Sequence, residues 1–205
     1  MRWRSAHDWA VESRQRYIGR VWALAEHVQT LEPREVLAFV LFTPQNRYER
    51  AVKDWQYWMK SGKKDVFRSN MWRKRERWLA RLPQNDRLTR LTVLDETWDH
   101  YISDLVNRVS GLAWSKAPFF ASLMYPTYPD VPVCIDVHMQ RWLYRKEVPI
   151  KRETQYQRAQ SLVARRAVRA GMPRFAYQWA VWDYVRSGGL PVTETSIKDD
   201  LIVKE

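Results

Sequence analysis

The amino-acid sequence predicts an all-α protein with a single core. Glycine is scarce, at six residues in 205, and apolar residues recur at the spacing of one helix face through most of the chain. Apolar residues make up 45% of the sequence, which at this length is enough for one core and little for two ordinary domains. There is no internal repeat, low-complexity tract or obvious linker. We therefore expect one domain over residues 1–190, folded as two helical lobes, and a loosely packed tail over 191–205.

The first helices are predicted before residue 60. Residues 5–27 place several large residues at spacings compatible with one helix face: Trp9, Tyr17, Val21, Trp22 and Leu24. A second helix begins at Pro33 and carries the run VLAFVLF, which indicates burial on all sides. It ends at Thr43, and a third helix, rich in aromatic residues, is expected over 45–59.

The most basic part of the chain follows. Residues 60–81 contain nine Lys or Arg and two acidic residues, with Trp72 and Trp78 between them. Such a segment is either a solvated helix face or a face that follows phosphates. After a break at 82–85, one or two further helices are expected over 88–109.

A tight turn is predicted at residues 110–113, with Ser115 and Lys116 near the start of the next helix, which runs to Met124. A turn of this kind leaves backbone N–H groups unpaired at a helix N-terminus. These groups can bind a phosphate without reading base sequence. Three prolines keep the following segment extended, and Asp136 is placed to cap the next helix with its side chain.

Two helices complete the prediction. Residues 154–170 form an amphipathic helix that Gly171 ends, and this helix carries four arginines: Arg158, Arg165, Arg166 and Arg169. Pro173 begins the last helix, which Gly188 and Gly189 end. Its predicted apolar face is formed by Phe175, Trp179, Trp182 and Val185.

The charge of the chain favours a polyanionic partner. Lys and Arg number 35 against 23 Asp and Glu, a net charge of +12, which suits DNA or RNA. A basic protein without such a partner is the simpler alternative. Twelve Trp and ten Tyr are expected to be mostly core, although rings beside cations also suit base stacking.

The single cysteine, Cys134, allows no disulfide within the chain, no Cys-based zinc site and no four-Cys iron–sulfur cluster. The longest apolar run, residues 36–42, is far shorter than the roughly 18 residues that span a bilayer. The N-terminal residues carry charge without an apolar segment, so no secretory signal is expected. We expect a cytoplasmic protein, associated with a nucleoid or present in an infected host cell, without contact to a membrane.

Taken in order, these motifs resemble the helix-hairpin-helix DNA glycosylases, the superfamily that includes endonuclease III and 8-oxoguanine DNA glycosylase. That family has an LPGhGxK hairpin followed by a VDxHhxR segment. Here Lys116 precedes Asp136, and IDVHM is similar to the second motif of the 8-oxoguanine enzyme. The resemblance covers roughly residues 35–185, with the hairpin at about 105–124. The hairpin SGLAWSK has one extra residue before the lysine and no second glycine, so Ala113 or Trp114 must take that glycine's place.

The resemblance implies a DNA glycosylase with AP-lyase activity and one nucleotide flipped out of the DNA. Duplex DNA and a monomer are the default expectations, and the sequence leaves single-stranded DNA and other oligomeric states open. Lys116 would attack C1′ and form a Schiff base, and Asp136 would stabilise positive charge and shuttle protons. Neither a metal nor another cofactor is needed. The hairpin would contact phosphate, Gln45 or Asn46 would fill the gap left by the extruded base, and His138 would contact phosphate or the flipped nucleotide. The remaining candidates are the hairpin residues Gly111, Ala113, Trp114 and Ser115, the pocket residues Trp114, Phe119, Phe120, Met139 and Trp142, and Arg141, for phosphate or an acidic side chain.

Other interpretations stay open. Lys116 alone is compatible with an exposed lysine at a helix start, and Asp136 alone with a simple helix cap. The whole chain is compatible with a virus-type enzyme that modifies thymines without breaking the glycosidic bond, or with a non-catalytic DNA-binding protein. The lysine at 116 favours excision, because base modification has no evident need for a nucleophile at C1′. Which base is recognised does not follow from the sequence.

Overall fold

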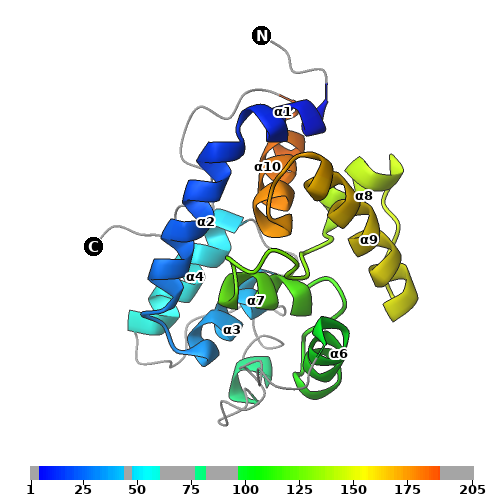
Figure 1. Ribbon diagram of the computed structural model, residues 1–205. Coiled ribbons are helices and arrows are strands. Elements are labelled where there is room, and N and C mark those ends of the chain that lie inside the picture. Colours follow the sequence, from blue (N-terminus) through cyan, green and yellow to red (C-terminus); the bar gives the residue numbers. More distant parts are fainter. Residues whose placement is uncertain (1–4, 44–47, 61–76, 82–96, 190–205) are drawn as a thin grey trace.

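The computed structural model describes residues 5–43, 48–60, 77–81 and 97–189. These residues form helices joined by turns and extended loops, with no strand among them, so the all-α prediction is confirmed (Figure 1). Gln45, Asn46, most of the basic segment 60–81 and the predicted tail lie outside the described residues.

The first predicted helix is two helices. The helix α1 (Ala6–Glu12) ends at Ser13, and α2 (Arg14–Val28) begins directly after it. Both pack against α10 (Arg174–Arg186). Trp22 is 59% exposed, so its predicted place on the buried face is wrong. At 100° per residue it lies well to one side of the stripe that buries Tyr17, Val21 and Leu24.

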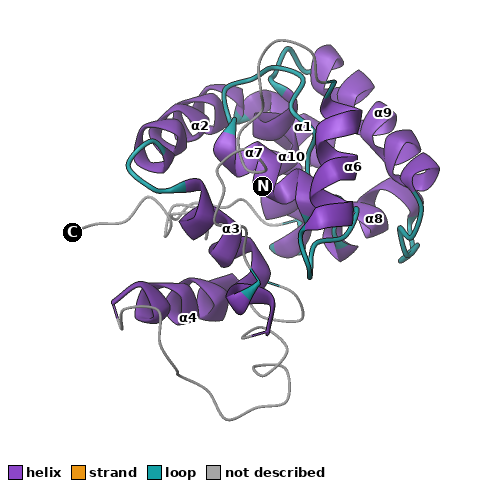
Figure 2. Cartoon of the chain, turned by 90° about the horizontal axis from the view of Figure 1, so that it is seen from below, coloured by secondary structure: helices purple, strands orange, loops and turns teal. Residues whose placement is uncertain are grey.

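The helix α3 (Pro33–Phe42) is buried along its whole apolar run, as predicted. It lies between α4 (Tyr48–Lys60) and α7 (Ala117–Met124). The α4 helix is held by Trp55, whose indole Nε1 donates to the Glu35 carbonyl oxygen at 3.0 Å and whose ring lies 5.6 Å from that of Phe39. Figure 2 shows α4 at one side of the molecule, below α3.

The remaining helices are α6 (Trp98–Arg108), α8 (Val137–Tyr144) and α9 (Glu153–Arg169). The predicted end of α9 is confirmed, because Gly171 adopts a positive φ of 62°. One hydrophobic cluster extends from α1 to α10, and α10 lies at its centre with every residue from Phe175 to Asp183 buried. No helix in the described part of the chain is long and apolar enough to cross a membrane.

Candidate functional site

The hairpin between α6 and α7 begins with a close contact at Gly111. This glycine has a φ of +94°, a conformation that side chains rarely adopt. A Cβ atom there would lie 2.5 to 2.8 Å from three ring atoms of Trp78. Gly111 is therefore required both by the backbone conformation and by the indole ring that packs on it.

The start of α7 leaves backbone donors unpaired. The Ala113 carbonyl accepts from the Lys116 and Ala117 amides at 2.8 and 2.9 Å, which forms one extra turn before the helix. The amides of Trp114 and Ser115 make no hydrogen bond with any described residue. Ala113 is exposed and Ser115 half-buried. The turn thus presents N–H groups at a helix N-terminus, the arrangement that binds anions.

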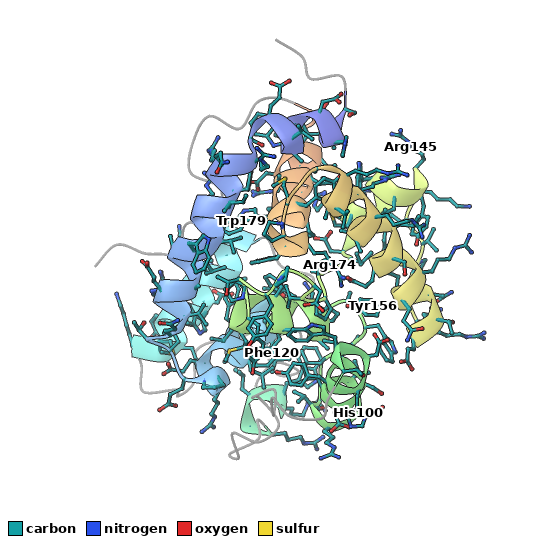
Figure 3. The ribbon with its side chains drawn as sticks, in the orientation of Figure 1. His100, Phe120, Arg145, Tyr156, Arg174 and Trp179 are labelled. Carbon is teal, nitrogen blue, oxygen red and sulfur yellow. The ribbon has the colours of Figure 1, made fainter. Side chains whose placement is uncertain are left out.

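Trp114 of the hairpin packs against α9. Trp114 is half-buried, and its ring lies 5.9 Å from that of Tyr156 on α9, at an interplanar angle of 32°. Burial raises the pKa of Tyr156 well above its usual value. Figure 3 shows Tyr156 and Arg174 in the region where α9 approaches α7. The Trp114 ring therefore packs between the hairpin and α9, and it does not line an open base pocket in this structure.

Lys116 is the N-cap residue of α7 and is half-buried. Its Nζ lies 5.5 Å from the centre of the Phe119 ring, within the range of a cation–π contact. Phe119 and Phe120 are buried in the core, so they support the helix and do not line an open pocket.

Asp136 follows a buried extended segment held by glutamine side chains. Gln160 of α9 accepts from the Val133 amide at 3.1 Å and donates to the Val133 carbonyl. Gln178 of α10 donates to the Cys134 carbonyl at 3.5 Å, and Gln140 donates to the next carbonyl, that of Ile135, at 3.2 Å. Because no sheet is present here, these side chains provide the partners that buried backbone groups need.

The Asp136 carboxylate is held by three hydrogen bonds. Its Oδ1 accepts from the amides of His138 and Met139, both at 3.1 Å, which confirms the predicted helix cap. Its Oδ2 accepts from the indole Nε1 of Trp182 on α10 at 2.7 Å. A carboxylate has about four acceptor sites, so one remains on this half-buried residue for a further partner.

An aromatic and basic cluster surrounds that carboxylate. The half-buried His138 ring lies 5.9 Å from the Trp182 ring in an edge-on arrangement. The Arg186 guanidinium lies 5.2 Å from the centre of the same indole. His138 is therefore beside the carboxylate, and its predicted contact with phosphate or a flipped nucleotide stays a prediction.

Three other candidate residues have protein partners. Met139 is fully buried, so its side chain belongs to the core and not to a pocket wall. Trp142 packs at 6.0 Å from the Tyr177 ring and carries the Arg166 guanidinium 4.4 Å above its own ring. Of the two predicted alternatives for Arg141, the structure contains the acidic one, an ion pair with Glu147.

The two central residues are not in direct contact. No ion pair or hydrogen bond joins Lys116 to Asp136. Lys116 is the N-cap of α7 and Asp136 is the N-cap of α8, and the Asp136 side chain is bonded to α10 through Trp182. The site therefore contains an amine, a carboxylate with a fixed orientation and a turn with unpaired N–H groups. No cluster of metal-binding side chains is found among the described residues.

Sequence reasoning missed the role of Trp182, which it assigned to the apolar face of the last helix. It also missed Gln160 and Gln178. One signal was present in α9, because Gln160 stands among the buried positions Ala159 and Val163, and a buried polar side chain needs a partner. The sequence alone does not say which backbone groups are that partner.

No known protein family, curated protein or solved structure matches this chain. The resemblance to the helix-hairpin-helix glycosylases therefore stays a prediction from the order and spacing of the sequence motifs.

Proposed function

We propose that this chain is a DNA glycosylase with AP-lyase activity, with a two-lobed fold of the helix-hairpin-helix type, that acts on duplex DNA as a monomer. The observation that carries the proposal is the Asp136 carboxylate, which caps α8 through two amides and is fixed from α10 by Trp182. A simple helix cap needs only the two amide bonds. The third bond gives the carboxylate one orientation, as charge stabilisation in a transition state requires.

The hairpin supports the choice of a nucleic-acid substrate. The free amides of Trp114 and Ser115 bind one phosphate of the strand, and a net charge of +12 favours the encounter. The target nucleotide leaves the stack, at a cost of a few kcal/mol. His138 and the remaining acceptor site of Asp136 then face the flipped nucleotide.

Catalysis requires a change at Lys116. The amine attacks C1′ with its lone pair while the bond from C1′ to the base breaks and the base leaves with the bonding electrons. Asp136 stabilises the positive charge on the sugar and takes the proton that the new amine gives up. It passes this proton to the ring oxygen as the C1′–O4′ bond breaks, while the departing base takes a proton from water. The sugar opens to a protonated imine, and loss of a C2′ proton expels the 3′ phosphate. The amine must be neutral to attack, and Lys116 must move from its position beside the Phe119 ring to reach C1′.

That same contact favours a second candidate, a base-modifying enzyme on the same fold. Such an enzyme needs a flipped base and a fixed carboxylate but no amine nucleophile. It would leave Lys116 on the Phe119 ring and out of contact with Asp136. The two candidates differ in one property, the formation of a covalent bond between Lys116 and DNA.

Borohydride trapping on duplexes with an abasic site or a modified base tests the proposal. We expect a covalent protein–DNA band with wild type, no band with Lys116→Ala and a strongly reduced band with Asp136→Asn. Lys53→Ala removes an exposed lysine on α4 and serves as the matched control. Absence of any adduct or strand nick with wild type would exclude the lyase and favour base modification or simple binding.

A further inference from the structure

The outer surface formed by α8, α9 and their connecting loop is strongly basic. Between residues 137 and 170 the chain has two acidic residues, Glu147 and Glu153, and nine basic ones: Arg141, Arg145, Lys146, Lys151, Arg152, Arg158, Arg165, Arg166 and Arg169. Both acidic side chains already have partners, because Glu147 pairs with Arg141 and Glu153 accepts from Gln157. The positive charge of this surface is therefore hardly neutralised.

Three of the arginines form a stripe along α9. Arg158, Arg165 and Arg169 are exposed, and at 100° per residue they lie within about 40° of one another. The stripe is on the side of α9 opposite to its buried residues, which include Tyr156, Val163 and Ala167. None of the three arginines makes an ion pair or a hydrogen bond with a described residue.

The N-terminal part of α9 contacts the hairpin and α6 through residues on the side away from the stripe or beside it, so the stripe itself faces outward from these contacts. Tyr156, two residues before Arg158, stacks on Trp114, and Gln157 donates to Asp99 of α6 at 3.4 Å. At about 1.5 Å per residue the stripe then extends some 16 Å along the helix. This length covers several phosphates of one DNA strand, which are about 3.4 Å apart along the axis.

Arg145 adds a positive charge to this surface, at a position where the backbone conformation is unfavourable for a residue other than glycine. It ends α8 with a φ of 59° and is the one described residue other than glycine with a positive φ. Figure 3 shows its side chain at the outer edge of the molecule, away from the core. The Arg158 guanidinium opposes the rise that burial causes in the pKa of Tyr144, the neighbour of Arg145. Arg166, the neighbour of Arg165 on α9, lies 4.4 Å from the centre of the Trp142 ring on α8, so α8 lies beside α9 along this part of the helix.

We infer that Arg145 and the stripe Arg158, Arg165 and Arg169 form a second DNA surface, which binds the phosphate backbone of the duplex beyond the hairpin. Unpaired arginines on one face suit phosphate geometry, and they carry no base selectivity. The surface extends the proposed function, but binding here needs neither Lys116 nor Asp136.

The test is the salt dependence of binding to an undamaged duplex, measured by fluorescence anisotropy. Each phosphate contact contributes about 0.9 to the slope of log Kd against log salt concentration. Arg158→Gln/Arg165→Gln should therefore lower that slope by about 1.8. The charge-retaining pair Arg158→Lys/Arg165→Lys should keep it, and Lys53→Gln on α4, at the other side of the molecule (Figure 1), should leave it nearly unchanged.

Arg145→Gly separates binding from folding. Glycine adopts the left-handed conformation freely, so the melting temperature should not fall, while the salt slope should fall by about 0.9. The inference is wrong if the glutamine pair leaves the slope unchanged, or if Lys53→Gln lowers it as much as each α9 substitution. It is also wrong if the pair abolishes binding to phosphatidylserine vesicles and not to DNA. The two proposals are tested independently. If the salt slope falls as expected but borohydride traps no adduct, the protein binds DNA through α9 and is not a lyase.

Discussion

The hydrogen bond from Trp182 to Asp136 can be measured as a coupling energy. Trp182→Phe keeps an aromatic ring in the core and removes the indole N–H that lies 2.7 Å from Oδ2. A hydrogen bond to a charged group contributes about 1.5–3 kcal/mol to stability. The substitution also leaves a smaller ring, which costs stability whether or not Asp136 is present. The free energy of unfolding of the single variant therefore mixes two effects.

A double-mutant cycle with Asp136→Ala separates them. Asp136→Ala alone loses the helix cap, about 1 kcal/mol, together with the indole bond. In that background Trp182→Phe should cost about 1.5–3 kcal/mol less than it does in wild type. Urea denaturation followed by circular dichroism gives each of the four free energies.

The matched control is Trp55→Phe, which also removes an indole hydrogen bond, that to the Glu35 carbonyl on α3. Its effect should be independent of Asp136 to within about 0.5 kcal/mol, as for distant sites. If the effects of Trp182→Phe and Asp136→Ala on the free energy of unfolding are also additive to within about 0.5 kcal/mol, the claim that Trp182 fixes the carboxylate is refuted.

Three further predictions concern the hairpin, the extended segment and α10. Gly111→Ala should cost about 1–3 kcal/mol of stability, because of the positive φ and the contact with Trp78, and should weaken duplex binding; thermal melting and anisotropy measure the two effects. Gln160→Ala leaves the amide and carbonyl of Val133 without a partner and should cost about 2–5 kcal/mol in urea denaturation, whereas a cost near zero would mean that water replaces the glutamine. Burial raises the pKa of Tyr177 from 10 to about 12, so the stabilising contribution of its neutral hydroxyl is complete below pH 10 and is lost as pH rises toward 12. Tyr177→Phe should reduce that loss of stability in melting curves across this range, and an unchanged pH dependence would contradict the assignment.

Much of the fold follows from local signals in the sequence. Pro33 begins α3, Gly171 ends α9, and Asp136 caps α8, all as predicted. Each of these signals acts within one helical turn, so one sequence is enough to recognise it. The break at Ser13 was missed, because apolar residues recur at helical spacing on both sides of it.

The site could be predicted less completely because its contacts join distant parts of the chain. The bond between Asp136 and Trp182 spans 46 residues, and that between Val133 and Gln160 spans 27. Helical periodicity indicates that Trp182 faces the core but does not identify the side chain that it meets. The contact of Trp114 with Tyr156 was missed for the same reason. The pairing of Arg141 with Glu147 was one of two alternatives that the sequence left open.

The most direct test of the central claim is to locate the covalent bond. Wild-type protein is reduced with borohydride on abasic duplex DNA, digested with a protease and a nuclease, and analysed by tandem mass spectrometry. We predict that the residual sugar is attached to Nζ of Lys116. Attachment to another lysine or to the N-terminal amine, or no attachment at all, would contradict the assignment of Lys116 as the nucleophile.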